Sequence, residues 1–258
     1  MKVSILMVTY GKDIEWAKYS LQSIRKFATG FQSVVVVVPN PDVVDFMGIV
    51  QGEMLYGYNE AAGKGMLHHM VKILQADEYC PGADAILHMD ADCFLTSPIT
   101  PETYIVDGKP VMCRQAYETF RNYAERYSWK ACVKNATGID PEYETMCRHP
   151  SVHLRDVYPI ARSIIHGHTG MGFDQYILSC KNSFPQTFAE FPTLGAVAIA
   201  YFNDRYHWMD WPPAEYNGLY QDHMTAFWSH GGMDSMNDRH PGKTARQIIN
   251  AALNENPT

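Results

Sequence analysis

The chain has 258 residues, of which 46% are hydrophobic and 19% are charged, and its formal net charge is −7. This composition is typical of a globular protein and excludes an intrinsically disordered chain. The negative charge argues against broad electrostatic binding to nucleic acid. The length suits one large core, so we predict a single domain over residues 1–258.

The N-terminus and the cysteines both favour a cytoplasmic protein. Residues 1–9 form a short apolar run that is typical of a strand and too short for a signal peptide. No apolar stretch reaches the roughly 20 residues that a membrane helix needs. The six cysteines are scattered without a Cys-x-x-Cys pair, so we expect reduced thiols and neither disulfides nor a zinc site.

Apolar strands alternate with helical patterns through the first hundred residues. The predicted strands are Val3–Thr9, Ser33–Val38 and Ala85–Met89. Apolar residues at helical spacing predict helices from Trp16 to Phe27 and over Gly65–Leu74. This alternation predicts an α/β fold whose mixed, mostly parallel sheet is flanked by helices.

The second half of the chain is less regular. Its pattern predicts a strand at Pro110–Cys113, a helix within Tyr117–Val133 and a long loop with short elements over Asn135–Arg155. The segment Ile164–Asp174 is rich in glycine and histidine, which suits backbone that approaches a ligand closely. An apolar helix is predicted over Ala196–Phe202. We interpret this half as a C-terminal elaboration of the same domain.

Two carboxylates, Asp90 and Asp92, follow directly after the predicted strand Ala85–Met89. Carboxylates are costly to bury unpaired, and two of them this close raise each other's pKa unless a cation neutralises them. The spacing lets both reach one divalent ion, or lets one reach the ion and the other a sugar hydroxyl. The alternative is a strand that simply ends in a polar turn. Ligands of parallel sheets bind beyond the carboxyl ends of the strands, where the loop Tyr10–Asp13 also falls.

Three features together resemble nucleotide-sugar-dependent glycosyltransferases of the GT-A fold. They are the segment Leu87–Phe94 (LHMDADCF), the opening strand with its Thr-Tyr loop, and the helix before the aspartate pair. The resemblance continues more faintly through residues 188–195. It implies a Rossmann-like fold with a nucleotide-sugar-binding half at residues 1–100 and an acceptor-binding half at residues 101–258. In that family, the Asp-x-Asp motif holds Mn²⁺ or Mg²⁺ on the diphosphate of the donor.

The resemblance implies a metal site. Asp92 is the expected direct ligand, and Asp90 is expected to contact the ribose or the donor sugar, or the metal through water. His230 is the expected third ligand because the family often supplies a histidine near the C-terminus. His223 and His240 are the alternatives, and a purely structural histidine is the competing interpretation for all three. Carboxylate and phosphate oxygens suit Mg²⁺ or Mn²⁺, and an imidazole ligand favours Mn²⁺.

The donor expected from the resemblance is a nucleotide sugar, with a UDP-sugar as the first expectation. Tyr10 offers an aromatic face for the nucleobase, and the backbone from Thr9 to Gly11 can hydrogen-bond the edge of the base. Lys72 could neutralise a phosphate, although a solvated helix lysine fits the pattern equally well. The family often carries Gln where His68 and His69 stand, so no role is carried over to those two residues.

The acceptor side of the reaction depends on stereochemistry. An inverting enzyme needs a carboxylate base for the attacking hydroxyl, and the candidates are Asp174 and Glu190. A retaining enzyme needs no such base. We therefore predict a metal-dependent, hexosyltransferase-like glycosyltransferase that moves a sugar from a nucleotide-diphosphate donor to an acceptor hydroxyl.

Several acceptors and two other functions stay open. The acceptor could be a saccharide, a lipid-linked sugar, a protein, a small molecule or hydroxymethylated pyrimidine in bacteriophage DNA. The aromatic and basic residues of Tyr117–Lys130 would suit a nucleic acid, whereas the net charge argues against it. A nucleotidyltransferase acting on sugar phosphates would carry a Gly-rich basic loop after the first strand, which Tyr10–Asp13 matches poorly. A non-catalytic nucleotide-sugar-binding module would bind the donor without hydrolysing it.

Overall fold

A computed structural model describes most of the chain. The described residues are 1–120, 124–146, 150–182, 187–210, 223–227, 229–234 and 242–254, without the side chains of residues 124–126 and 230. Cys80, Cys93, Cys113, Cys132 and Cys180 are free thiols, as expected, and Cys147 lies outside the described residues.

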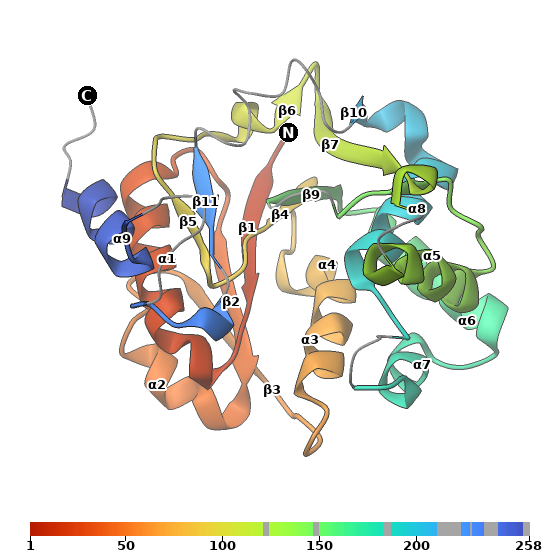
Figure 1. Cartoon of the computed structure of the whole chain (residues 1–258), viewed down its shortest axis with the longest axis horizontal. Helices are drawn as coiled ribbons and strands as arrows, with labels where there is room; N and C mark the ends of the chain where they lie inside the picture. Colours follow the sequence, from red (N-terminus) through yellow and green to blue (C-terminus); the bar gives the residue numbers. More distant parts are fainter. Residues whose placement is uncertain are drawn as a thin grey trace.

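A five-stranded sheet in the order β3-β2-β1-β4-β9 forms the centre of the molecule (Figure 1). β1 (Val3–Val8), β2 (Val34–Pro39), β3 (Met54–Tyr58) and β4 (Ala85–His88) are parallel, and β9 (Ser151–Leu154) is antiparallel to β4. The predicted mixed, mostly parallel sheet is confirmed. β1, β2 and β4 are buried along almost their whole length, as expected for apolar strands that helices cover on both faces.

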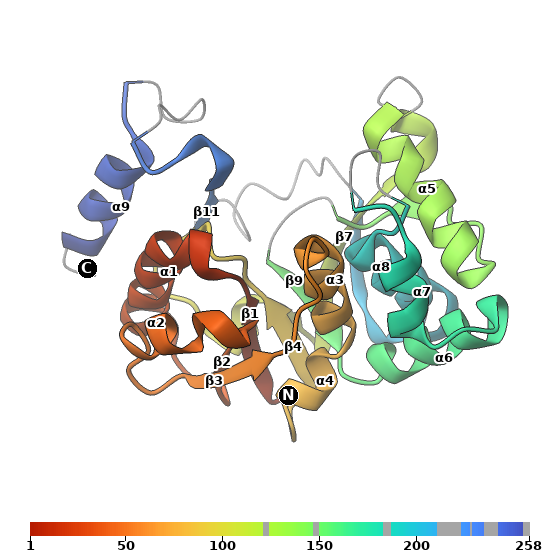
Figure 2. The same cartoon turned by 90° about the horizontal axis from the view of Figure 1, so that it is seen from below.

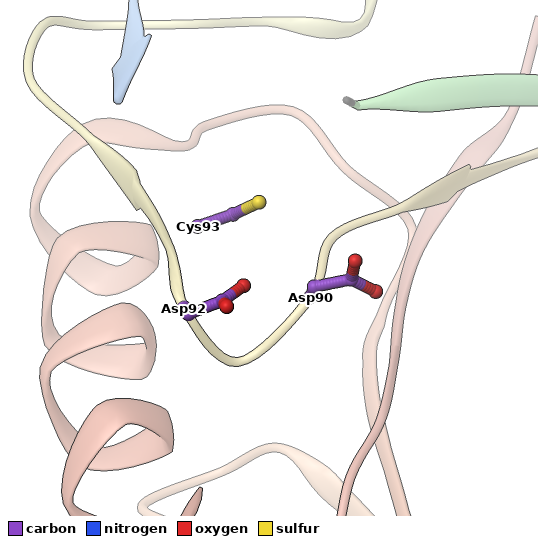
Figure 3. A group of neighbouring side chains, drawn as sticks. All are labelled: Asp90, Asp92 and Cys93. Atoms are coloured by element: carbon purple, nitrogen blue, oxygen red, sulfur yellow. The ribbon is translucent and has the colours of Figure 1, made fainter. Parts of the chain in front are cut away.

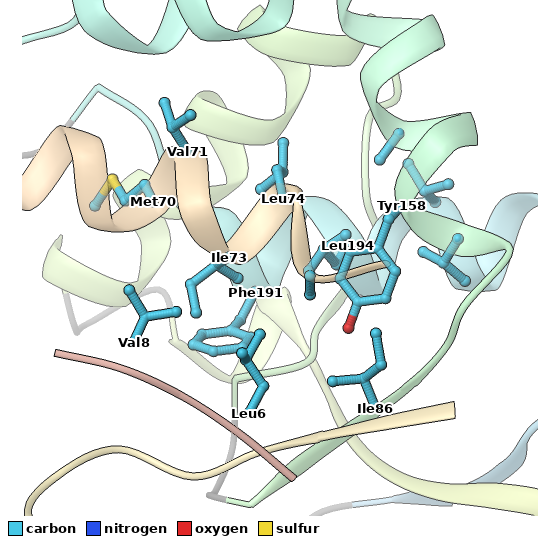
Figure 4. Packing of buried hydrophobic residues seen from close by; sticks show 14 of the residues in the cluster. Leu6, Val8, Met70, Val71, Ile73, Leu74, Ile86, Tyr158, Phe191 and Leu194 are labelled. Atoms are coloured by element: carbon cyan, nitrogen blue, oxygen red, sulfur yellow. The ribbon is translucent and has the colours of Figure 1, made fainter. Parts of the chain in front are cut away.

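Helices pack on both faces of this sheet. One face carries α1 (Ile14–Phe27), α2 (Val43–Met47) and α9 (Ala245–Asn254). The other carries α3 (Gly65–Leu74), α4 (Ala76–Tyr79), α6 (Val157–Thr169) and α8 (Glu190–Phe202). Figure 2 shows the two groups on opposite sides of the sheet. Successive side chains of β1 point to opposite faces of the sheet. Ile5 therefore packs against the first group of helices, whereas Leu6 and Val8 pack against the second (Figure 4).

The remaining elements build the second half of the chain. β7 (Lys109–Ala116) pairs with β6 (Ile105–Val106), β8 (Tyr143–Glu144) and β10 (His207–Asp210), and β5 (Cys93–Leu95) pairs with β11 (Met224–Ala226). The other helices are α5 (Ala124–Thr137) and α7 (Phe173–Ser179). Short 3-10 helices occupy Gly11–Asp13 (η1), Asn40–Asp42 (η2), Pro101–Thr103 (η3), Tyr117–Phe120 (η4), Asn203–Arg205 (η5) and Ser229–Gly231 (η6).

A helix that crosses a membrane needs about 20 consecutive, mostly apolar residues. None of the helices in the described part of the chain combines the length and the apolar character that crossing a bilayer requires.

The two irregular segments predicted for the second half have different outcomes. The described part of Asn135–Arg155 contains the short strands β8 and β9, which agrees with a long loop that carries short elements. The interpretation of Ile164–Asp174 as backbone close to a ligand is wrong. The segment Ile164–Asp174 lies mostly in α6, which ends at Gly170 with a φ of 71°, a left-handed conformation that favours glycine. The glycines and histidines there belong to a helix and to the turn that follows it, and not to a ligand-binding loop.

Burial of His153, on β9, makes the stability of the fold depend on pH. The side chain is fully buried, and this burial lowers its pKa from 6.5 to about 3. The rings of His88, Tyr158 and Phe191 surround it. Between those two pKa values the unfolded chain binds a proton that the folded chain does not. The contribution of His153 to stability is therefore complete above pH 6.5 and falls as the pH drops toward 3.

We expect His153 to lower the free energy of unfolding by roughly 2 kcal/mol between about pH 7.5 and pH 5. Urea denaturation at both pH values measures this change. His153→Leu removes the titrating group, so its free energy of unfolding should vary less over the same range. Equal pH dependence in the two proteins would contradict the assignment.

Candidate functional site

The loops after β1 and β4 meet at the carboxyl edge of the central sheet. β2 and β3 lie on one side of β1 and β4 lies on the other, so the strand order reverses between β1 and β4. Such a reversal leaves a crevice beyond the strand ends, where ligands of open α/β sheets bind. An open cavity of about 170 Å³ lies there. Its lining residues are Val8, Thr9, Tyr10, Asp13, His69, Asp90, Ala91, Asp92 and Ser229.

Asp90 and Asp92 belong to the tight loop between β4 and β5, together with Cys93 (Figure 3). One ligand atom from each of the three residues lies within 4.8 Å of the others. The two aspartates are half-buried, whereas the Cys93 side chain is buried within β5. Partly exposed carboxylate oxygens at this separation suit a hard divalent cation such as Mg²⁺ or Mn²⁺.

A segment from late in the chain holds Asp92 in place. The Ser229 N–H donates to Oδ2 of Asp92 at 3.0 Å, across 137 sequence positions. The Phe227 N–H donates to the Asp92 carbonyl oxygen at 2.9 Å, and β11 pairs with β5 so that Ala226 lies opposite Cys93. The aspartate pair is therefore built together with this late segment.

The structure describes the three candidate histidine ligands to different extents. His230 follows Ser229 directly in η6, so its backbone lies at the aspartate pair. The side chain of His230 lies outside the described residues, and its role as a metal ligand stays a prediction. His223 shares a hydrogen bond of 2.7 Å between its Nδ1 and the Ser97 hydroxyl, and it is not among the lining residues of the cavity. His240 lies outside the described residues.

Thr9 and Tyr10 line the cavity at the end of β1. Tyr10 is 37% exposed, and its pKa is raised by partial burial and by the negative charges of Asp13 and Asp92. Thr9 is only 3% exposed, and its Oγ1 has no hydrogen-bond partner within the described ranges. An unmet buried hydroxyl costs about 1–3 kcal/mol, and a ligand in the cavity would remove that cost.

The backbone of Gly11 forms hydrogen bonds within the protein. Its N–H donates to Oδ2 of Asp42 at 2.7 Å, and its carbonyl oxygen accepts the Ile14 N–H. A Cβ at this position would lie 2.7 Å from Oδ1 of Asp42, so a larger residue would displace this carboxylate. The Thr9 N–H is likewise donated to the Val37 carbonyl oxygen. The N–H groups of Thr9 and Gly11 are thus both used within the protein, and the expected backbone contact to a nucleobase over Thr9–Gly11 stays a prediction.

Lys72 and Asp174 lie near each other but not among the lining residues of the cavity. The Lys72 ammonium donates to Oε1 of Gln75 at 2.7 Å and lies 5.3 Å from the centre of the Tyr58 ring. Burial lowers the pKa of Lys72, and the negative charges of Glu78 and Asp174 oppose that effect. These two predicted site residues therefore lie outside the lining of the cavity that holds the aspartate pair.

Glu190, the other candidate base, is the first residue of α8. The next residue, Phe191, is buried, and its ring centre lies 5.2 Å from that of His88 at the end of β4. His88 precedes Asp90 by two residues. This contact places the start of α8 beside the strand that carries the aspartate pair.

Three polar lining residues have no role predicted from sequence: Asp13, His69 and Ser229. The neighbouring histidines on α3 differ in environment. His68 is 9% exposed, and its Nε2 accepts the Ala61 N–H at 3.0 Å, whereas His69 lines the cavity. The sequence offers one signal for His69, which is its position on the predicted helix. The residues before and after it are buried, so His69 lies at the edge of the side of α3 that faces the core.

No model of a known protein family matches this chain, and no curated protein is significantly similar to it. The functional argument therefore depends on the residues and their geometry.

The unmet hydroxyl of Thr9 gives a direct test of the cavity. Thr9→Val replaces the hydroxyl with a methyl group of the same shape, so the melting temperature should stay equal or rise. The affinity for a nucleoside diphosphate with Mn²⁺, measured by titration calorimetry, should fall about fivefold because one hydrogen bond is lost.

Ser20→Ala is the matched control. Ser20 is 1% exposed, and its hydroxyl also has no partner among the described residues, but it lies on α1 outside the cavity lining. Its affinity for the nucleotide should equal that of the wild type. Equal affinities in all three proteins would remove Thr9 from the binding site.

Proposed function

We propose that this protein is a metal-dependent glycosyltransferase that moves a sugar from a nucleotide-diphosphate donor to an acceptor hydroxyl. One observation carries the proposal. Asp90 and Asp92 line a single cavity with Thr9, Tyr10 and Ser229, at the point where the strand order of a mostly parallel sheet reverses. Carboxylates for a cation, an aromatic face and a hydroxyl without a partner among the described residues are groups that can bind a nucleoside diphosphate.

The aspartate pair would hold the cation. Mn²⁺ or Mg²⁺ bound there would neutralise the charge that develops on the diphosphate as the donor bond breaks. The Ser229 N–H donates to Oδ2 of Asp92 and so helps to orient the carboxylate.

Tyr10 and Thr9 would bind the nucleotide end of the donor. The partly exposed Tyr10 ring offers a stacking surface, and Thr9 lines the cavity beside it. We expect a bound nucleotide to reach the Thr9 hydroxyl, which is itself buried. His69, on the α3 side, would offer an imidazole N–H to phosphate or sugar oxygens. A UDP-sugar is the first donor to test.

Glu190 is the base that we propose for an inverting reaction. It begins the helix whose Phe191 ring packs on His88, and so it stands beside the strand that carries Asp90. Neither Glu190 nor Asp174 is among the lining residues of the cavity, and Asp174 lies near Lys72. The carboxylate of Glu190 would take the proton of the acceptor hydroxyl as that oxygen attacks the sugar.

A thermal-shift screen of UDP-, GDP- and dTDP-sugars with Mn²⁺, followed by donor hydrolysis assays, tests the function. The matching donor should stabilise the fold by about 2.7 kcal/mol at a concentration of 100 times its Kd, and only with the metal. Binding without hydrolysis would identify a non-catalytic module. Absence of binding to all three donors with any divalent metal would refute the proposal.

Asp92→Asn tests the cation site. The amide oxygen can still accept the Ser229 N–H, so the melting temperature should change by about 2 °C or less. The charge is lost, so Mn²⁺ binding and metal-dependent hydrolysis should fall about 100-fold. Titration calorimetry and donor hydrolysis measure the two effects.

Asp84→Asn is the control at the opposite end of β4. Asp84 also accepts a backbone N–H, from Lys2 at 2.7 Å, and its substitution should leave Mn²⁺ affinity unchanged. If Asp92→Asn loses its fold along with its activity, Asp92 is a structural residue and not a metal ligand.

A further inference from the structure

Behind the aspartate pair, five buried side chains form what we call the histidine cluster: His88, Ser151, His153, Tyr158 and Phe191. None of them is more than 3% exposed. In the pairing of β4 with β9, His88 lies opposite Ser151 and Ile86 lies opposite His153. Residues directly opposite each other, or two apart on one strand, share a face of a sheet. His88, Ser151 and His153 therefore all face the helices α6 and α8.

His88 is held from both of these helices. Its Nε2 forms a hydrogen bond of 2.6 Å with the Tyr158 hydroxyl of α6. The Phe191 ring of α8 meets the His88 ring edge-on, with centres 5.2 Å apart and an angle of 78°. The same Phe191 ring stacks on His153 at 6.4 Å and 14°. Figure 4 shows Tyr158 and Phe191 among the core residues over this face of the sheet.

The histidine cluster links the proposed cation site at Asp90 to the proposed acceptor base, Glu190. His88 ends β4 and precedes Asp90 by two residues, and the Met89 N–H between them donates to the Leu6 carbonyl oxygen at 3.0 Å. Phe191 follows Glu190 directly. Any shift of His88 relative to Phe191 therefore changes the separation between Asp90 and Glu190.

The histidine cluster lowers the stability of the core because it buries polar groups. Both ring nitrogens of His153 and the Ser151 hydroxyl are buried without a hydrogen-bond partner in the described part of the chain. Unmet buried polar groups cost free energy that apolar side chains of the same shape would not. Local violations of this kind gather at functional sites, where position matters more than stability.

We propose that His88 and Tyr158 are positioning residues, and that their hydrogen bond sets the place of Asp90 relative to Glu190. This inference rests on the proposed function. Neither residue touches the donor. Their effect reaches the cation site through the end of β4, and it reaches the acceptor base through the Phe191 ring.

Tyr158→Phe tests the proposal because it removes only the hydroxyl. We expect the Mn²⁺ dissociation constant, measured by calorimetry on the full chain, to rise about tenfold. The kcat for donor hydrolysis should fall by a similar factor.

Tyr206→Phe is a closely matched control. The Tyr206 hydroxyl is also buried and accepts the Leu154 N–H at 2.8 Å, but at the end of β9 that pairs with Ala85, away from Asp90. Both variants lose one buried tyrosine hydrogen bond, so their melting temperatures should fall by similar amounts. Only Tyr158→Phe should change metal affinity and kcat.

Two substitutions of His88 separate its hydrogen bond from its packing. The amide of His88→Gln can still bond the Tyr158 hydroxyl, whereas His88→Leu cannot. We expect the Gln variant to keep an Mn²⁺ affinity within about threefold of the wild type and the Leu variant to lose about tenfold. Equal losses in the two variants would overturn the role of the bond.

The outcomes separate the two proposals. A wild-type protein that binds no nucleotide sugar with any divalent metal would refute the proposed function, and the inference would fall with it. A wild-type protein that binds Mn²⁺ while Tyr158→Phe and Tyr206→Phe behave alike would refute the positioning role alone. A selective loss in Tyr158→Phe, with rescue in His88→Gln, supports both.

Discussion

The hydrogen bond from the Ser229 N–H to the Asp92 carboxylate joins distant parts of the chain at the candidate site. It adds to the pairing of β5 with β11, which begins at the residue after Asp92. Closing a loop of this length costs a few kcal/mol of chain entropy, and burial of Met224 and Met233 in the core offsets that cost. Because of this closure, the cavity has walls from both halves of the chain.

The cavity lies where the protein leaves polar groups unmet or half-exposed. The Asp90 and Asp92 carboxylates are half-buried, and the Thr9 hydroxyl is buried without a partner among the described residues. The histidine cluster continues this pattern behind β4, where the ring nitrogens of His153 also lack partners in the described part of the chain. Most of the sheet around them is apolar and tightly covered. Between the Thr9 hydroxyl and the His153 ring nitrogens, only the Thr9 hydroxyl belongs to a residue of the cavity lining, so it is the one whose free-energy cost a ligand there would lower.

The elements that could be predicted are those whose burial shows in the sequence. β1, β2 and β4 are continuous apolar runs, and α3 has its apolar residues at helical spacing, with the predicted bounds Gly65–Leu74. β3 escaped prediction because it is a partly exposed edge strand with a glycine, and β9 because its four residues include Ser151 and His153. These polar residues become core only because β9 pairs with β4 and is covered by α6 and α8.

The sequence by itself determined that two carboxylates follow a buried parallel strand, and that the Thr9-Tyr10 loop follows another. These are local facts, because apolar runs and the residues directly after them specify strand ends. Only the tertiary structure brought Ser229 to Asp92 and distinguished His69 from His68. It also placed Lys72 with Asp174 outside the cavity lining. Those outcomes depend on long-range strand pairing and on the rotation of α3 against the sheet, and no local pattern encodes either.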